Sequence, residues 1–208
     1  MGNKGKTFPP EPLDLDEVLA LVGACSKTSS TGLRNRALIV VLWRSGLRTG
    51  EALGLFPKDV DLDEGVIRVL HGKGDKFRTV GVDEAAIAVL RLWIERRARL
   101  DLPRFCPLFC TLKGTRIDPS YLRHTLPRLA ARAGIEKRVH AHGLRHTLTR
   151  DLVTAGAPMD LIRDQLGHTS LSTTDKYVHK VAPQRLVNFM RTRAWGSESE
   201  GGQDESGN

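Results

Sequence analysis

Two arginines, two histidines and one tyrosine are the residues of this sequence whose types and spacing could do chemistry. Guanidinium groups are planar, always charged and able to bind two phosphate oxygens at once, so they suit a phosphodiester that gains negative charge during transfer. A phenol, with a pKa of about 10, attacks phosphorus only when positive charge and a base assist it. The set predicts covalent attack on a phosphodiester by a tyrosine, and its members are Arg48, His142, Arg145, His168 and Tyr177.

Two of these residues share one motif, His142-Gly-Leu-Arg145-His146. Residues three apart on a helix face the same side, so His142 could relay the proton of the tyrosine while Arg145 holds the phosphate. The spacing of His142 and His146, with His140 nearby, also fits a zinc site. However, the motif lacks the acidic residue of a His-Glu-x-x-His site. We therefore predict no metal and a core position for His146.

The remaining members lie in three other stretches. Arg48 follows Gly46 at a helix-breaking turn, from which its side chain could point outward. His168 follows a glycine at a predicted helix end and could donate a hydrogen bond to a phosphate oxygen. Lys73 lies between two glycines of a predicted β-turn, where a flexible ammonium could protonate the departing oxygen, and Lys76 is its close rival.

Each of these residues also has an ordinary structural explanation when it is taken alone. A single arginine is more often a solvated surface charge, and a single tyrosine more often packs in a core. A lysine at a hairpin tip is usually only solvated. The functional interpretation therefore depends on the residues occurring together.

The composition permits a polyanionic partner. The chain has 208 residues, enough for one domain with its own core, and a formal net charge of +8. Residues 196–208 contain acids and no base, so the rest of the chain is more basic still. Basic residues placed on phosphates release counterions, which favours a nucleic acid; a basic protein with no such partner is the alternative.

The cysteines and the start of the chain suggest a cytoplasmic protein. Three cysteines without framework spacing indicate a reducing compartment, and we expect Cys106 and Cys110 to pack as apolar side chains. The polar start does not resemble a signal peptide, and the longest apolar run, 37–43, is too short to span a bilayer. We therefore expect no membrane association.

Hydrophobic periodicity predicts a mixed fold, mainly α-helical with a small antiparallel β-sheet. Asp14 and Glu17 form a capping-box pattern, and two alternating apolar runs, 65–70 and 77–82, predict a hairpin. We expect residues 1–12 to be a flexible arm, 13–195 one domain and 196–208 a disordered acidic tail. Predicted helices cover 15–25, 34–44, a short segment from 51, 83–100, 118–134, 143–155, 158–166, 173–179 and 183–194.

These motifs together resemble the tyrosine recombinase, or phage integrase, family over residues 13–195. Arg48 is similar to the arginine of the family's first box, with Glu51 at its supporting acidic position. The resemblance implies catalytic roles for Arg48, Lys73, His142, Arg145, His168 and the nucleophile Tyr177. Lys76 and Arg78, close to the hairpin lysine, are expected to bind DNA.

The resemblance implies the catalytic-domain fold of DNA breaking–rejoining enzymes and a reaction without metal, ATP or another cofactor. Tyr177 would form a 3′-phosphotyrosyl link and release a 5′-hydroxyl, and the hydroxyl of a partner strand would rejoin the DNA. In this family four protomers act on two double-stranded DNA sites. This implies a monomer alone and a homotetramer in a DNA synapse, with 183–190 as the candidate helix that is lent to a neighbour.

Some alternatives stay open. Family members usually carry a helical DNA-clamping domain before the catalytic domain, whereas only residues 1–12 precede it here, which fits a truncated form or a natural minimal form. A type IB topoisomerase and a non-catalytic DNA-binding regulator are the other functions; the spacing before Tyr177 and the intact set favour a recombinase. The target site and the biological context cannot be read from the sequence, because base readout depends on groove placement.

Overall fold

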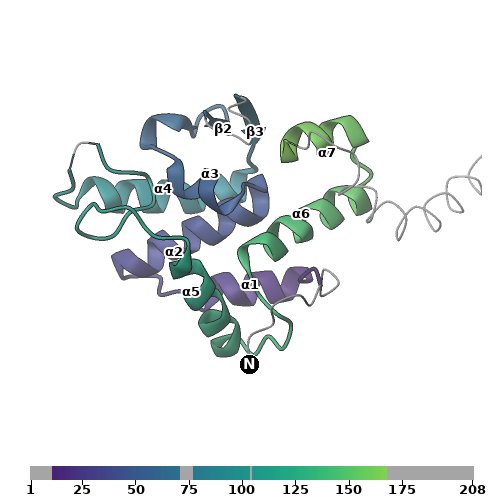
Figure 1. Cartoon of the computed structure of the whole chain (residues 1–208), viewed down its shortest axis with the longest axis horizontal. Coiled ribbons are helices and arrows are strands. Elements are labelled where there is room, and N and C mark those ends of the chain that lie inside the picture. Colours follow the sequence, from purple (N-terminus) through teal and green to yellow (C-terminus); the bar gives the residue numbers. More distant parts are fainter. Residues whose placement is uncertain (1–10, 71–76, 104, 168–208) are drawn as a thin grey trace, which may run out of the picture.

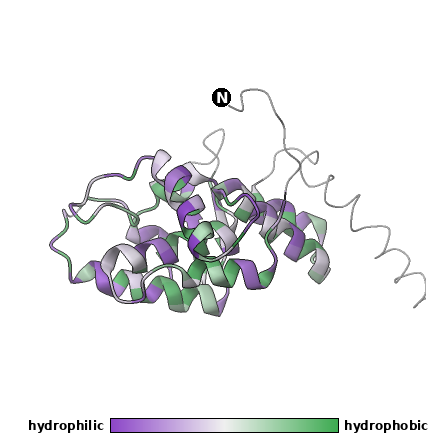
Figure 2. Cartoon of the chain, turned by 90° about the horizontal axis from the view of Figure 1, so that it is seen from below, coloured by the Kyte–Doolittle hydropathy of each residue, from purple (hydrophilic) through white to green (hydrophobic). Residues whose placement is uncertain are grey.

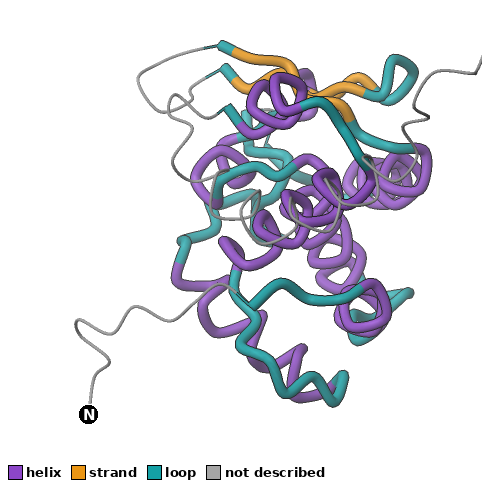
Figure 3. Tube along the Cα trace, turned by 90° about the vertical axis from the view of Figure 1, so that its right-hand side faces the viewer, coloured by secondary structure: helices purple, strands orange, loops and turns teal. Residues whose placement is uncertain are grey.

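The computed structural model describes residues 11–70, 77–103 and 105–167. Helices make up its body, and the small sheet lies at one end of them (Figures 1 and 3). In chain order the elements are α1 (Leu15–Gly23), α2 (Ser30–Val40), the π-helix η1 (Val41–Ser45), α3 (Thr49–Gly54), the 3₁₀-helix η2 (Pro57–Asp59), β1 (Val60–Asp61), β2 (Val66–Val69), β3 (Arg78–Gly81), α4 (Glu84–Ala98), α5 (Ser120–Arg132), α6 (Ala141–Ala155) and α7 (Met159–Leu166). Residues 1–10 of the predicted arm, the tail and the predicted helices 173–179 and 183–194 lie outside the described residues, as do Lys73, Lys76, His168 and Tyr177.

The sheet is antiparallel, with the strand order β1-β2-β3. β2 and β3 form the predicted hairpin, in which Val66 lies opposite Gly81 and Val69 lies opposite Arg78. β1 was not predicted: it is two residues long, too short for an alternating pattern, and pairs Val60 with Ile67. The predicted mixed fold, mainly α with a small antiparallel sheet, is confirmed.

Local capping explains where the first helices begin. Asp14 caps α1 as predicted, because its carboxylate accepts from the backbone N–H of Glu17 at 3.0 Å and the Glu17 carboxylate accepts from that of Asp14 at 2.8 Å. The prediction for α2 was wrong by a turn: the Ser29 hydroxyl accepts from Gly32 N–H, so the helix begins at Ser30 rather than 34. None of the helices in the described residues is long and apolar enough to cross a membrane.

Most of the apolar side chains form one core that extends from α1 to the start of α6. The helices show hydrophobic and hydrophilic residues on different sides, as expected when one face packs inward (Figure 2). A smaller cluster joins α6 to α7 through Leu148, Val153, Ile162 and Leu166. α7 is therefore held by its own contacts with α6 and by its packing against β3.

The end of η1 is a turn that lies directly before Arg48. Gly46 adopts φ +64°, a left-handed conformation that favours glycine. A Cβ atom at this position would lie 2.8 Å from Cδ2 of Leu148 and 2.8 Å from Cδ2 of Leu166. The helix that precedes Arg48 therefore stops here and packs closely against α6 and α7.

We expect Gly46→Ala to lower the free energy of unfolding by about 1–3 kcal/mol, because the side chain adds both backbone strain and contact with two leucines. Gly54→Ala is the matched control, since a Cβ there meets nothing within 4 Å and its φ is not positive. Urea unfolding of both variants is the measurement. Equal stabilities of the two variants would contradict this account of Gly46.

Candidate active site

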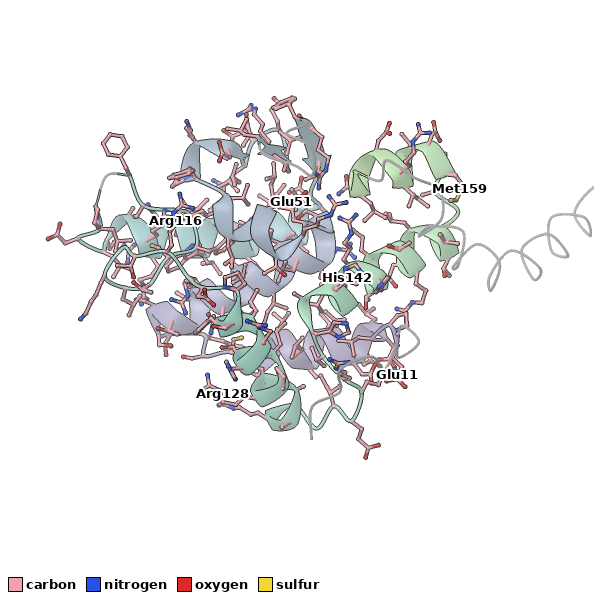
Figure 4. The ribbon with its side chains drawn as sticks, viewed as in Figure 1. Glu11, Glu51, Arg116, Arg128, His142 and Met159 are labelled. Carbon is pink, nitrogen blue, oxygen red and sulfur yellow. The ribbon has the colours of Figure 1, made fainter. Side chains whose placement is uncertain are left out.

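Three of the predicted catalytic residues lie in the described part of the chain: Arg48, His142 and Arg145. They lie together where α3, α6, α7 and β3 meet. Figure 4 shows side-chain nitrogen atoms gathered between Glu51, on α3, and His142, on α6. Arg48 is the N-cap residue of α3 and has extended backbone, with a side chain that is 34% exposed. Its Nη1 donates to Glu51 Oε1 at 2.9 Å, and its Nη2 donates to the carbonyl of Gly167 at 3.3 Å.

Glu51 is the carboxylate at the centre of this cluster, with a side chain only 5% exposed. Besides Arg48 Nη1, its oxygens accept from the backbone N–H of Arg48 at 2.8 Å and from both Nη atoms of Arg78 at 2.9 and 2.8 Å. Burial alone would raise the pKa of Glu51, but the hydrogen bonds from Arg78 and Arg48 lower it to about 2. Glu51 is therefore ionised at neutral pH and supports Arg48.

Arg145 is the most enclosed of the predicted catalytic residues that the structure describes, at 3% exposure. Its Nη1 donates to the carbonyl of Gly46, and its Nη2 donates to that of Leu166 at 2.6 Å. Both carbonyls lie at helix ends, where they carry partial negative charge and lack helical partners. Burial, followed by the charge of Arg48, lowers the pKa of Arg145 to about 10, so the guanidinium stays charged at neutral pH.

His142 lies in the first turn of α6 and is exposed to solvent, although its ring is partly covered by that of His146. Burial lowers its pKa, and the charges of Arg145, His140 and Arg48 lower it further. The ring is therefore neutral at neutral pH and able to accept a proton. His146, expected in the core, is instead half-buried, with its ring centroid 4.3 Å from that of His142 in an edge-on arrangement.

The cluster carries more positive than negative charge. Arg48, Arg78 and Arg145 surround the single carboxylate of Glu51, and the charges of Arg48 and Arg78 both act on Arg145 to lower its pKa. Like charges held this close are stabilised when an anion binds among them. The arrangement suits a phosphate group that gains charge during reaction.

The four predicted site residues outside the described part of the chain lie near residues of this cluster in sequence, two before Arg78 and two after Gly167. Gly167, whose carbonyl accepts from Arg48, directly precedes His168. Arg78 begins β3 two residues after Lys76. The roles of Lys73, Lys76, His168 and Tyr177 therefore stay predictions.

Sequence reasoning missed one residue that holds these segments together. Gln165, on α7, accepts from Gly81 N–H at 3.0 Å and donates to the Gly81 carbonyl at 2.9 Å. Its side chain also donates to the carbonyl of Ser45 at 3.3 Å. A side-chain amide that binds distant backbone groups leaves no local sequence signal, so Gln165 could not have been found from spacing.

The fold is that of the catalytic domains of tyrosine recombinases. Residues 11–183 match the phage integrase family, and the chain belongs to this family. It is 34% identical over 199 residues to the tyrosine recombinase XerD of Bifidobacterium longum, an alignment that covers 91% of this chain and 64% of that relative. The chain thus spans less than two thirds of the relative's length.

Solved structures of recombinases are similar in fold to this chain. The crystal structure of XerA recombinase superposes with a TM-score of 0.78 at 32% identity, covering 93% of this chain and 68% of that one. XerH site-specific recombinase, in a post-cleavage complex with a palindromic difH substrate, gives a TM-score of 0.73 at 29% identity, covering 92% and 55%. The fold prediction is thereby confirmed at the level of the family.

We expect Glu51→Gln to lower the free energy of unfolding by about 3 kcal/mol at neutral pH, because the folded protein holds the Glu51 pKa near 2 whereas the ordinary value is 4.5. This contribution is fully present above pH 4.5 and is lost as the pH falls through about 2. The difference between wild type and variant should therefore narrow across that interval in urea unfolding experiments.

Glu64→Gln, at an exposed position, is the control and should change stability by less than about 0.5 kcal/mol. A Glu51→Gln penalty that stays constant from neutral pH to pH 3 would contradict the ionised, hydrogen-bonded state of Glu51.

Proposed function

We propose that this chain is the catalytic domain of a tyrosine site-specific recombinase, which cleaves and rejoins DNA through a 3′-phosphotyrosyl intermediate. The observation that carries the proposal is the meeting of Arg48 and Arg145, far apart in sequence, beside a neutral His142. Two guanidinium groups and a proton acceptor at one point are what phosphodiester transfer to a phenol requires.

The arginines would bind the non-bridging oxygens of the scissile phosphate. Arg48 donates only some of its N–H groups to Glu51 and Gly167, and its side chain is partly exposed, so it can reach an incoming phosphate. Arg145 is fixed from two sides by carbonyl oxygens, which aim its guanidinium without neutralising it. Groups fixed before the substrate arrives stabilise developing charge without having to reorganise.

Bond making and breaking would follow from this binding. Tyr177 loses its proton to His142 and attacks phosphorus, so a bond from its phenol oxygen to phosphorus forms while the bond to the 5′ oxygen breaks. Lys73, or Lys76 in its place, gives that oxygen its proton, and His168 donates a hydrogen bond to the phosphate. A 5′-hydroxyl of a partner strand then reverses the step, so the phosphodiester energy is conserved and no cofactor is needed.

Double-stranded DNA is the proposed partner. The excess positive charge of the chain and the XerH structure with its difH substrate both support a DNA partner. We further propose that the chain is a monomer alone and a homotetramer on two DNA sites. Recombination is favoured over topoisomerase-like relaxation because the XerD, XerA and XerH relatives are all named as recombinases.

The first test is to trap the protein on DNA. A nicked suicide duplex library, incubated with the protein in EDTA, should give SDS-stable adducts that peptide mass spectrometry maps to Tyr177. Tyr177→Phe should abolish the adducts while leaving binding to DNA nearly unchanged, because only the nucleophile is lost. Tyr121→Phe is the matched control at the second tyrosine of the chain. Adducts that persist in Tyr177→Phe would remove Tyr177 from the site.

The pH dependence of cleavage tests His142. A proton acceptor must be neutral to act. Because the pKa of His142 is lowered from its ordinary value of 6.5, we expect full activity above pH 6.5 and a loss of activity at lower pH. The second-order rate constant with subsaturating DNA is the quantity to measure, since it reports groups of the free protein. His142→Gln should reduce that constant by about 10²-fold and remove the decline on the acid side. The control is His124→Gln, at an exposed position of α5, which should leave the rate constant and its decline at acid pH unchanged. If the decline at acid pH survives in His142→Gln, His142 is not the proton acceptor.

A further inference from the structure

Arg78 was expected to bind DNA, but its guanidinium points into the protein. The side chain is 14% exposed, and its two Nη atoms donate side by side to the two oxygens of Glu51. Its Nε is buried and has no acceptor among the residues that the structure describes. Both Nη atoms of Arg78 are bound to a carboxylate that neutralises their charge, whereas Arg145 is bound to uncharged carbonyls and keeps its charge for a phosphate.

Arg78 also lies against the end of α7. A Cβ atom at Gly167 would lie 2.7 Å from Nε and 2.8 Å from Cδ and Cζ of Arg78, so only glycine leaves room for this side chain. The carbonyl of the same glycine accepts from Arg48. Arg78 thus joins three segments: β3, where it begins the strand; the end of α7, one residue before His168; and Glu51, which holds Arg48.

The charge of Arg78 also affects how strongly Arg48 can bind a phosphate, because both arginines contact Glu51. If Arg48 were the only cation on Glu51, the carboxylate would neutralise it and compete with an incoming phosphate. With Arg78 bound to both oxygens, the negative charge of Glu51 is already balanced. The charge of Arg48 and that of Arg145 then remain for the substrate.

We infer that Arg78 is a positioning residue of the recombinase site, which fixes Glu51, the base of the β2–β3 hairpin and the end of α7 relative to Arg48, and does not contact DNA phosphate. The inference rests on the proposed function for its catalytic meaning. A lysine cannot replace Arg78 here, because an ammonium is a single point of charge and cannot hold both carboxylate oxygens in the fixed geometry of a guanidinium.

The test compares Arg78→Lys and Arg78→Ala with Arg68→Lys. Arg68 is the matched control because it lies on the neighbouring strand β2, is 44% exposed and pairs with Asp61 on the surface. Binding is measured in a Tyr177→Phe background at several salt concentrations, and the single-turnover cleavage rate is measured at saturating DNA. Circular dichroism establishes that each variant is folded.

If Arg78 is a positioning residue, its substitution should lower the cleavage rate and leave the affinity for DNA nearly unchanged. Cleavage at saturating DNA should fall at least about 10-fold in Arg78→Lys, because misplaced groups lose rate even when charge is kept. The dissociation constant should stay within about 3-fold of wild type, with an unchanged salt dependence, and Arg68→Lys should cleave like wild type. If Arg78→Ala does not fold, Arg78→Lys decides the question.

The opposite pattern overturns the inference. A phosphate contact predicts weaker binding and a salt slope reduced by about one in Arg78→Ala, with the saturated cleavage rate unchanged. Wild-type cleavage in Arg78→Lys also overturns it. Absence of any covalent adduct in the wild-type chain is a different result: it rejects the proposed function, while the binding and salt measurements still decide whether Arg78 contacts phosphate.

A double variant separates an effect through Glu51 from an independent one. If Arg78 acts by holding Glu51, adding Arg78→Lys to Glu51→Gln should reduce cleavage by less than about 3-fold further, because the interaction is already lost. Multiplication of the two separate losses would overturn the claim that Arg78 acts by holding Glu51 and would leave its contact with the end of α7 as the cause.

Discussion

The carboxylate of Glu51 offsets the repulsion among the guanidinium groups that this fold brings together. Three arginines reach the same small region from α3, β3 and α6, and the charges of two of them depress the pKa of the third. Glu51 binds Arg48 and Arg78 directly, whereas Arg145 is held by carbonyls at helix ends. Positive charge can therefore be concentrated for a phosphate without separating the segments that carry it.

The carbonyl groups at two helix ends hold Arg145, just as the carboxylate of Glu51 holds the other two arginines. Gly46 ends η1 and Gly167 follows α7, both in the left-handed conformation, and the carbonyls of Gly46 and Leu166 turn toward Arg145. A buried arginine needs acceptors, and helix C-termini supply them along with the negative end of their dipoles. The turns that stop the helices and the buried Arg145 are thus parts of one arrangement.

The sequence predicted what depends on local pattern and missed what depends on distant contacts. The capping box at Asp14, the hairpin of β2 and β3 and the positions of Arg48 and Arg145 all follow from short motifs. The inward direction of Arg78 could not be predicted, because its partner Glu51 lies 27 residues away and strand alternation alone does not reveal a carboxylate on one side. Residues 41–44 were predicted as ordinary helix. Together with Ser45 they form a π-helix that ends at Gly46, whose packing depends on leucines in α6 and α7.

The amide of Gln165 has a consequence beyond joining α7 to the sheet. β3 lies at the edge of the sheet, and an edge strand offers unpaired N–H and C=O groups to which a strand of another molecule can add. Gln165 occupies both the N–H and the carbonyl of Gly81. A side chain from a helix thus takes the place of a fourth strand at Gly81, so these two backbone groups are not open to a strand of another molecule.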